Sequence, residues 1–73
     1  FVQLNTDKGK ALLFFDQIIY IQPSESDSRD KEVLMKDGNS ILLKNITFAK
    51  LLSQLPKADF CESTKRILLR WHQ

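Results

Sequence analysis

The stretch NITFAKLLSQLP, residues 45–56, carries the clearest structural signal in the sequence. Its large apolar residues recur at i, i+3, i+4 and i+7, the spacing of one helix face, and they are Phe48, Leu51, Leu52 and Leu55. Thr47 precedes them as a candidate N-cap, and Pro56 ends the helix because it has no amide proton to donate. A helix of about ten residues is marginal alone. We therefore expect its apolar stripe to cover a small sheet.

Short segments rich in β-branched and aromatic residues surround this helix. They predict strands at residues 1–4, 11–15, 18–21, 32–36, 41–44 and 67–69. Asp16 and Gln17 form the corner between the second and third of these segments. In the third, strict alternation would place Ile19 and Ile21 on one face of the sheet, and Ile18 and Tyr20 on the other.

Asp37 and Gly38 predict a tight hairpin between the fourth and fifth strands, because glycine tolerates the positive φ that such a turn requires. A loop of these two residues would place Leu34 opposite Ile41. It would also place Val33 opposite Leu42.

Three further segments are predicted from their composition. Residues 23–30 hold no large apolar side chain and predict an exposed, mobile loop. Residues 57–59 follow the helix as a short connector, and Phe60 is a candidate anchor for the segment after it.

The length and composition indicate one small globular domain spanning residues 1–73. No run approaches the roughly 20 apolar residues that a membrane-spanning helix needs. The single cysteine, Cys61, cannot form an internal disulfide, which fits a reducing compartment. The chain starts at Phe1 rather than Met, so we expect it to be a piece of a longer protein.

The formal net charge is +2, and residues 57–73 carry four basic side chains against two acidic ones. This excess is compatible with an anionic partner but is too mild to establish one.

Residues capable of catalysis are sparse in the sequence. Cys61 and His72 lie eleven positions apart near the C-terminus, and His72 has no partners at metal-ligand spacing. Asp16 and Asp37 both occupy turns, where carboxylates accept backbone hydrogen bonds. We therefore expect no enzymatic activity, no metal, no cofactor and no small-molecule substrate.

Four segments together resemble the LytTR domain, the DNA-binding output domain of many bacterial response regulators. They are DQIIYI at 16–21, VLMKDG at 33–38, ILL at 41–43, and TFAKLLSQLP at 47–56 followed by Phe60. The resemblance covers residues 11–60. It implies a mainly β fold with one short helix, built as an elongated stack of small antiparallel sheets. In that family, loops along one face enter successive major grooves of DNA.

The resemblance also implies a function and a set of contact residues. It implies sequence-specific binding of double-stranded DNA by a cytoplasmic regulator of a two-component system, with a homodimer on repeated half-sites as one arrangement. The DNA-binding candidates come from the polar loop and from the motif after Phe60, and they are Arg29, Lys31, Thr64, Lys65 and Arg66. Basic side chains there would contact phosphates, and Arg29 or Arg66 would reach a guanine edge.

The motif after Phe60 departs from the family pattern. Glu62 stands where the family has an arginine, and only Lys65 keeps the basic character of its position. A further strand pair of the family has no counterpart here, so we expect a truncated domain. The alternative is a degenerate copy of this fold that binds protein or pairs with itself through strand edges. Acidic residues favour this alternative, and they are Glu25, Asp27, Asp30, Glu32 and Glu62.

Overall fold

The computed structural model of the chain describes residues 1–69, so the expectation for His72 lies outside the described residues. Within that range the chain forms one α-helix, one 3-10 turn and seven strands. In order these are β1 (Val2–Thr6), β2 (Gly9–Leu13), η1 (Phe15–Gln17), β3 (Ile18–Pro23), β4 (Lys31–Met35), β5 (Ser40–Leu43), α1 (Phe48–Gln54), β6 (Ala58–Cys61) and β7 (Arg66–Leu69). No helix among these residues is long and apolar enough to cross a bilayer.

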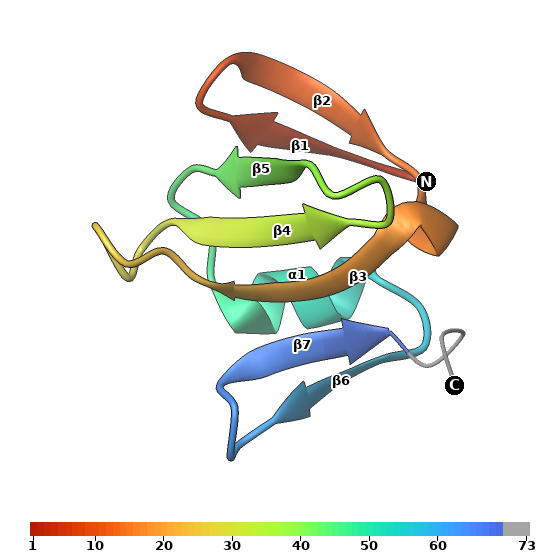
Figure 1. Cartoon of the computed structure of the whole chain (residues 1–73), viewed down its shortest axis with the longest axis vertical. Coiled ribbons are helices and arrows are strands. Elements are labelled where there is room, and N and C mark those ends of the chain that lie inside the picture. Colours follow the sequence, from red (N-terminus) through yellow and green to blue (C-terminus); the bar gives the residue numbers. More distant parts are fainter. Residues whose placement is uncertain (70–73) are drawn as a thin grey trace.

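The strands form a single antiparallel sheet in the order β2-β1-β5-β4-β3-β7-β6, and α1 covers one face of it (Figure 1). The mainly β architecture with one short helix is confirmed. The strands belong to one sheet rather than to several because β5 pairs with both β1 and β4, and β3 with both β4 and β7. The principal extents are 30 × 25 × 24 Å, so the domain is nearly as wide as it is long.

The core lies between the sheet and α1. Its buried members are Leu4, Leu13, Ile18, Ile21, Val33, Leu43, Leu51, Leu55, Ile67 and Leu69. Phe48 and Leu52 pack against this cluster, so the predicted apolar stripe of the helix does face the sheet. The predicted N-cap is also confirmed, because the Thr47 hydroxyl accepts a hydrogen bond from the Lys50 amide at 3.2 Å.

The predicted facing of β3 is wrong. Ile18 and Ile21 are both fully buried, whereas Ile19 is 36% exposed. The pairing of β3 with β4 shifts register between Ile18 and Tyr20, so the strand carries an irregularity there. A bulge of this kind adds one residue to one strand and breaks the alternation of side chains on which the prediction depended.

The predicted hairpin register is wrong by one residue. Val33 pairs with Ile41 and Leu34 with Ser40. The Met35 amide donates to the Asn39 carbonyl, which closes a loop of three residues rather than two. Gly38 occupies that loop with a φ of 90°, so glycine does supply the expected left-handed conformation.

The segment after the helix contains a strand that the sequence did not predict. Residues 58–61 form β6, which pairs with β7, whereas we expected residues 57–59 to be a connector. Phe60 is an anchor as predicted, because its ring centroid lies 5.0 Å from that of Phe48 on α1.

Candidate nucleic-acid interface

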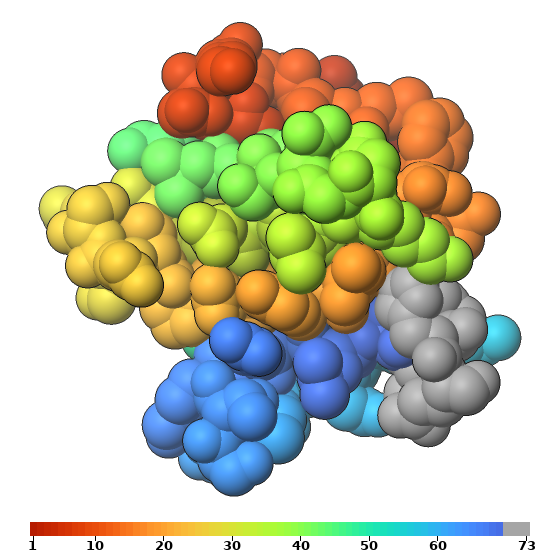
Figure 2. All heavy atoms as spheres, in the orientation of Figure 1, coloured from red at the N-terminus to blue at the C-terminus, as the bar shows by residue number. Residues whose placement is uncertain are grey.

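Four connections emerge at the same end of the sheet. Neighbouring strands align Thr6 with Leu43, Leu43 with Lys31, and Lys31 with Pro23. The β6–β7 turn joins the same end because β7 runs antiparallel to β3. We call this region the loop end, and it consists of residues 7–8, 24–30, 44–47 and 62–65. Figure 2 shows the β3–β4 loop and the β6–β7 turn on the same side of the molecule, in yellow and blue.

Asp30 ties the β3–β4 loop to the chain that leads into α1. Only 6% of Asp30 is exposed. Its carboxylate accepts hydrogen bonds from Lys44 Nζ at 2.8 Å and from the Asn45 amide at 2.9 Å. These two donors hold the pKa of Asp30 below its usual value. The expectation that this loop is exposed along its whole length is therefore wrong at Asp30.

Lys31, one of the predicted DNA contacts, is 5% exposed. Its ammonium group donates to the carbonyl of Ser28 and lies 5.1 Å from the ring centroid of Phe48. This cation–π contact links the start of β4 to the helix. In this arrangement Lys31 adds little to the accessible charge of the loop end.

Arg29 is the exposed cation of the β3–β4 loop, with 78% of its side chain accessible. Its guanidinium pairs with Asp27 through two hydrogen bonds, of 3.2 and 2.9 Å. Hydrogen bonds from Arg29 lower the pKa of Asp27 to about 2. Arg29 is thus accessible to solvent and already held by an anion.

Thr64 and Lys65 are both exposed in the β6–β7 turn. Lys65 Nζ lies 3.3 Å from the Glu62 carboxylate, and 66% and 83% of the two side chains are accessible. An ion pair this exposed contributes little to stability. A phosphate can therefore replace Glu62 as the partner of Lys65 at low energetic cost.

Arg66 begins β7 and links two strands on the face opposite α1. Its Nε donates to Gln22 Oε1 at 3.0 Å, and its guanidinium lies 4.3 Å from the Tyr20 ring centroid. Gln22 in turn donates to Glu32 at 3.0 Å. These bonds give Arg66 a cross-strand structural role in addition to its charge.

The loop end also holds two lysines that the sequence did not single out. Lys8 is exposed in the β1–β2 turn, and Lys44, paired with Asp30, follows β5. Their place beside Arg29 depends on the strand order, which pairs β5 with β1 as well as with β4. No local pattern in the sequence contains that information.

Cys61 adjoins the β6–β7 turn and is half-buried. Hydrogen bonds from Ser63 and Thr64 lower its pKa to about 7, and its Sγ lies 3.2 Å from Ser63 Oγ. Among residues 1–69, no three histidine, cysteine or acidic side chains gather in a way that could hold a metal ion.

The fold and the loop end define a small mainly β domain whose loops present paired cations and anions at one end of a single sheet. Comparisons of the chain with models of protein families, with curated proteins and with solved structures found no match. What the domain binds is therefore inferred from the residues of the loop end.

Proposed function

We propose that this domain binds double-stranded DNA through its loop end, as the sequence-specific output domain of a bacterial transcriptional regulator in the cytoplasm. The observation that carries the proposal is the strand register, which brings the two polar segments at 24–30 and 62–65 to one end of the sheet. The LytTR family, which the sequence resembles, also approaches DNA with loops that lie along one face of the fold. The domain performs no catalysis in this proposal.

The exposed cations and the less accessible ones have different roles in this proposal. Arg29 and Lys65 contact phosphates, and the Thr64 hydroxyl donates a further hydrogen bond from the same turn. Lys8 extends this surface from the neighbouring β1–β2 turn. Lys31 and Arg66 hold β4 and β7 in place, so that the loops keep a fixed spacing.

The test is a titration of duplex DNA at two salt concentrations, with variants that remove charge from opposite ends of the sheet. Arg29→Gln/Lys65→Asn removes two cations from the loop end. Lys36→Gln/Lys57→Asn removes two exposed cations from the other end. Lys65 and Lys57 both have a φ of 57°, which asparagine tolerates, so the backbone cost is matched.

The wild type should bind with a Kd of roughly 10⁻⁴–10⁻⁶ M for non-specific DNA, with log K falling by about 0.9 per phosphate for each unit of log salt. Arg29→Gln/Lys65→Asn should weaken binding. It should also make log K fall less steeply with log salt, by about the contribution of two phosphates. The control, Lys36→Gln/Lys57→Asn, should leave the affinity and its salt dependence unchanged. Equal losses in the two variants, or no binding at low salt, would refute the proposal.

A second function, self-association through the β2 edge, is favoured by apolar side chains exposed beside that edge. Phe1, Leu12 and Phe14 are 71%, 48% and 53% exposed, and β2 ends the sheet with one side unpaired. An edge strand can add a strand from another chain. Sedimentation should then show a dimer that Leu12→Lys converts to a monomer.

A further inference from the structure

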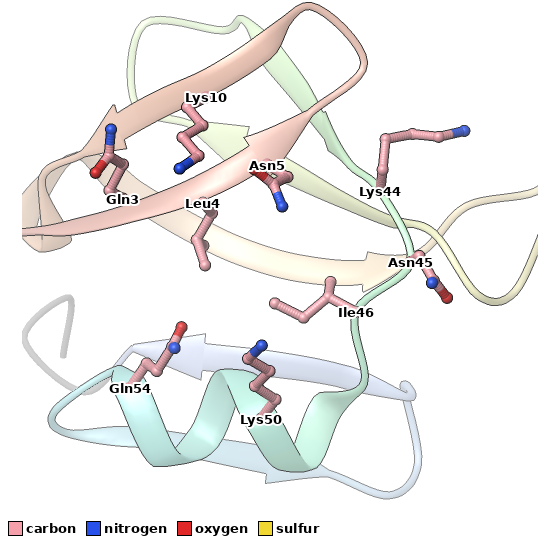
Figure 3. Close-up of a pocket in the computed structure, with 9 residues that line it drawn as sticks. All are labelled: Gln3, Leu4, Asn5, Lys10, Lys44, Asn45, Ile46, Lys50 and Gln54. Carbon is pink, nitrogen blue, oxygen red and sulfur yellow. The ribbon is translucent and has the colours of Figure 1, made fainter.

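A polar pocket of about 210 Å³ lies between the β1–β2 hairpin and α1 (Figure 3). Lys50 and Gln54 project from α1 toward the hairpin, and Asn5 projects from β1 toward the same space. Lys10 lines the pocket from β2. The β1–β2 hairpin and α1, which are distant in the sequence, therefore both contribute nitrogen atoms to one hollow.

The lining of this pocket carries positive charge without negative charge. It contains the lysines Lys10, Lys44 and Lys50, and no carboxylate. Lys44 points away from the hollow, and its ammonium group is neutralised by Asp30 at 2.8 Å. Within residues 1–69, the ammonium groups of Lys10 and Lys50 form no ion pair and no hydrogen bond with another protein group.

Two unpaired ammonium groups that face one hollow repel each other and attract an anion. Charge-assisted hydrogen bonds from lysine to phosphate oxygens are among the stronger polar contacts in proteins. The side-chain amides of Asn5 and Gln54 can donate to the remaining oxygens. We propose that this pocket binds the phosphate group of a small phosphate monoester.

The volume and the apolar lining of the pocket restrict the class of ligand that it can bind. Sites for drug-sized ligands have volumes of about 300–1,000 Å³, so this smaller pocket fits a phosphate with only a few carbon atoms. Leu4 and Ile46 supply an apolar part of the lining, against which a short carbon chain can pack. A phosphorylated small alcohol satisfies both conditions.

This site goes beyond the proposed DNA-binding function and does not depend on it. The pocket borders the loop end through residues 44–46, but the two lysines proposed to bind the phosphate, Lys10 and Lys50, lie outside the loop end. A small-molecule ligand also differs from what the sequence alone led us to expect. Binding of the ligand and binding of DNA can therefore be measured separately on the same variants.

The experiment titrates the isotope-labelled 73-residue chain with inorganic phosphate and with glycerol phosphate, at constant ionic strength balanced with chloride. NMR should show saturable shifts that cluster at the amides of Asn5, Lys50 and Gln54. Glycerol phosphate should bind more tightly than inorganic phosphate because its carbon chain contacts Leu4 and Ile46. Lys10→Gln/Lys50→Gln should weaken binding by at least about tenfold. The control Lys36→Gln/Lys57→Asn, which removes the same number of charges, should change it by less than about twofold.

Shifts spread evenly over all lysines, or an equal loss in the control, would overturn the site, since either would indicate general attraction to positive charge. Lys10 and Lys50 are both exposed, so their variants should keep the wild-type spectrum elsewhere. A short DNA duplex provides the last arm of the test. If the duplex displaces glycerol phosphate, and Lys10→Gln/Lys50→Gln also weakens duplex binding, the pocket holds the DNA backbone and the small-molecule proposal fails.

Discussion

The β3–β4 loop and the β6–β7 turn are both short polar segments at the loop end, yet they are held in different ways. The loop is fastened to the rest of the fold through Asp30 and through Lys31, which are 6% and 5% exposed. The side-chain hydrogen bonds of residues 62–65 stay within the turn and the adjacent Cys61, and the ion pair of the turn, Lys65 with Glu62, is exposed. Polar composition therefore does not determine whether a segment is anchored; the position of its partners does.

This difference assigns different tasks to the two segments in the proposed interface. A fastened loop can set the spacing and register of the domain on DNA, because its backbone is already ordered before binding. A turn with only local contacts can adjust its side chains to the phosphates it meets. This contrast can be tested by substitution, beginning with the change expected to destabilise the attachment of both segments.

Phe48→Ala should cause the largest effect, because Phe48 packs against residues that adjoin both segments. Its ring lies under Lys31 at the start of β4 and against Phe60 on β6. Removing it should lower the free energy of unfolding by about 3 kcal/mol, the lower end of the range for this substitution, since the side chain is only partly buried. Urea denaturation measures this change. Phe14→Ala, at an aromatic that is 53% exposed, is the control and should change stability little.

Asp30→Ala should destabilise the domain less than Phe48→Ala but clearly more than Asp27→Ala. The substitution leaves Lys44 and the Asn45 amide without their acceptor, whereas Asp27 pairs only with exposed Arg29. Asp30→Asn should be intermediate, because it keeps an oxygen for Asn45 and loses the charge that pairs with Lys44. Amide exchange at Asn45 and Ile46 should accelerate in Asp30→Ala. Equal stabilities of Asp30→Ala and Asp27→Ala would show that the contacts of Asp30 do not anchor the loop.

Acid should loosen the β3–β4 loop. The pKa of Asp30 is lowered by Lys44, and that of Asp27 to about 2 by Arg29. Because both values lie below the unfolded-state value of about 3.9, the unfolded chain binds protons first as the pH falls. The stabilisation from these carboxylates is thus complete above about pH 4 and is lost as the pH drops through the folded-state pKa values. NMR titration of the carboxyl carbons measures both, and a normal pKa at Asp30 would contradict the loop contacts.

Glu62→Gln should have the smallest effect on stability, because exposed ion pairs contribute about 0–1 kcal/mol. Its effect on DNA binding should nevertheless be measurable, since the substitution removes an anion that competes for Lys65. We expect tighter binding to duplex DNA at low salt with an unchanged urea midpoint. Weaker binding would indicate that Glu62 holds Lys65 in its working position.

The features that the sequence predicted correctly are those encoded by neighbouring residues. Thr47, the apolar stripe and Pro56 together specify the helix within about ten positions, and the structure reproduces its cap and its buried face. The glycine turn at Gly38 is also local, although one extra loop residue shifted the register. Local chemistry of this kind acts before the chain has folded, so it is visible in the sequence.

The features that the sequence missed depend on distant partners. Lys31 is buried because Phe48, seventeen positions later, offers a ring face to its ammonium group. Residues 58–61 become a strand because β7 pairs with them, and their own composition is not strongly β-prone. The predicted DNA-binding residues accordingly divide into exposed ones, such as Arg29 and Lys65, and ones that the tertiary fold uses for its own contacts.

The β1–β2 hairpin is joined to the rest of the sheet by few backbone contacts, which affects how the protein unfolds locally. The hairpin has five paired positions of its own but meets β5 at the single pair Thr6–Leu43, with two adjacent backbone hydrogen bonds. Residues 18–69, in contrast, contain the helix and every pairing that the other five strands make with one another. We therefore expect the hairpin to detach at a lower free energy than global unfolding requires. Each detachment bares the edge of β5 and withdraws Leu4 and Leu13 from the core, so the burial of these two leucines limits how often this domain exposes a new sheet edge.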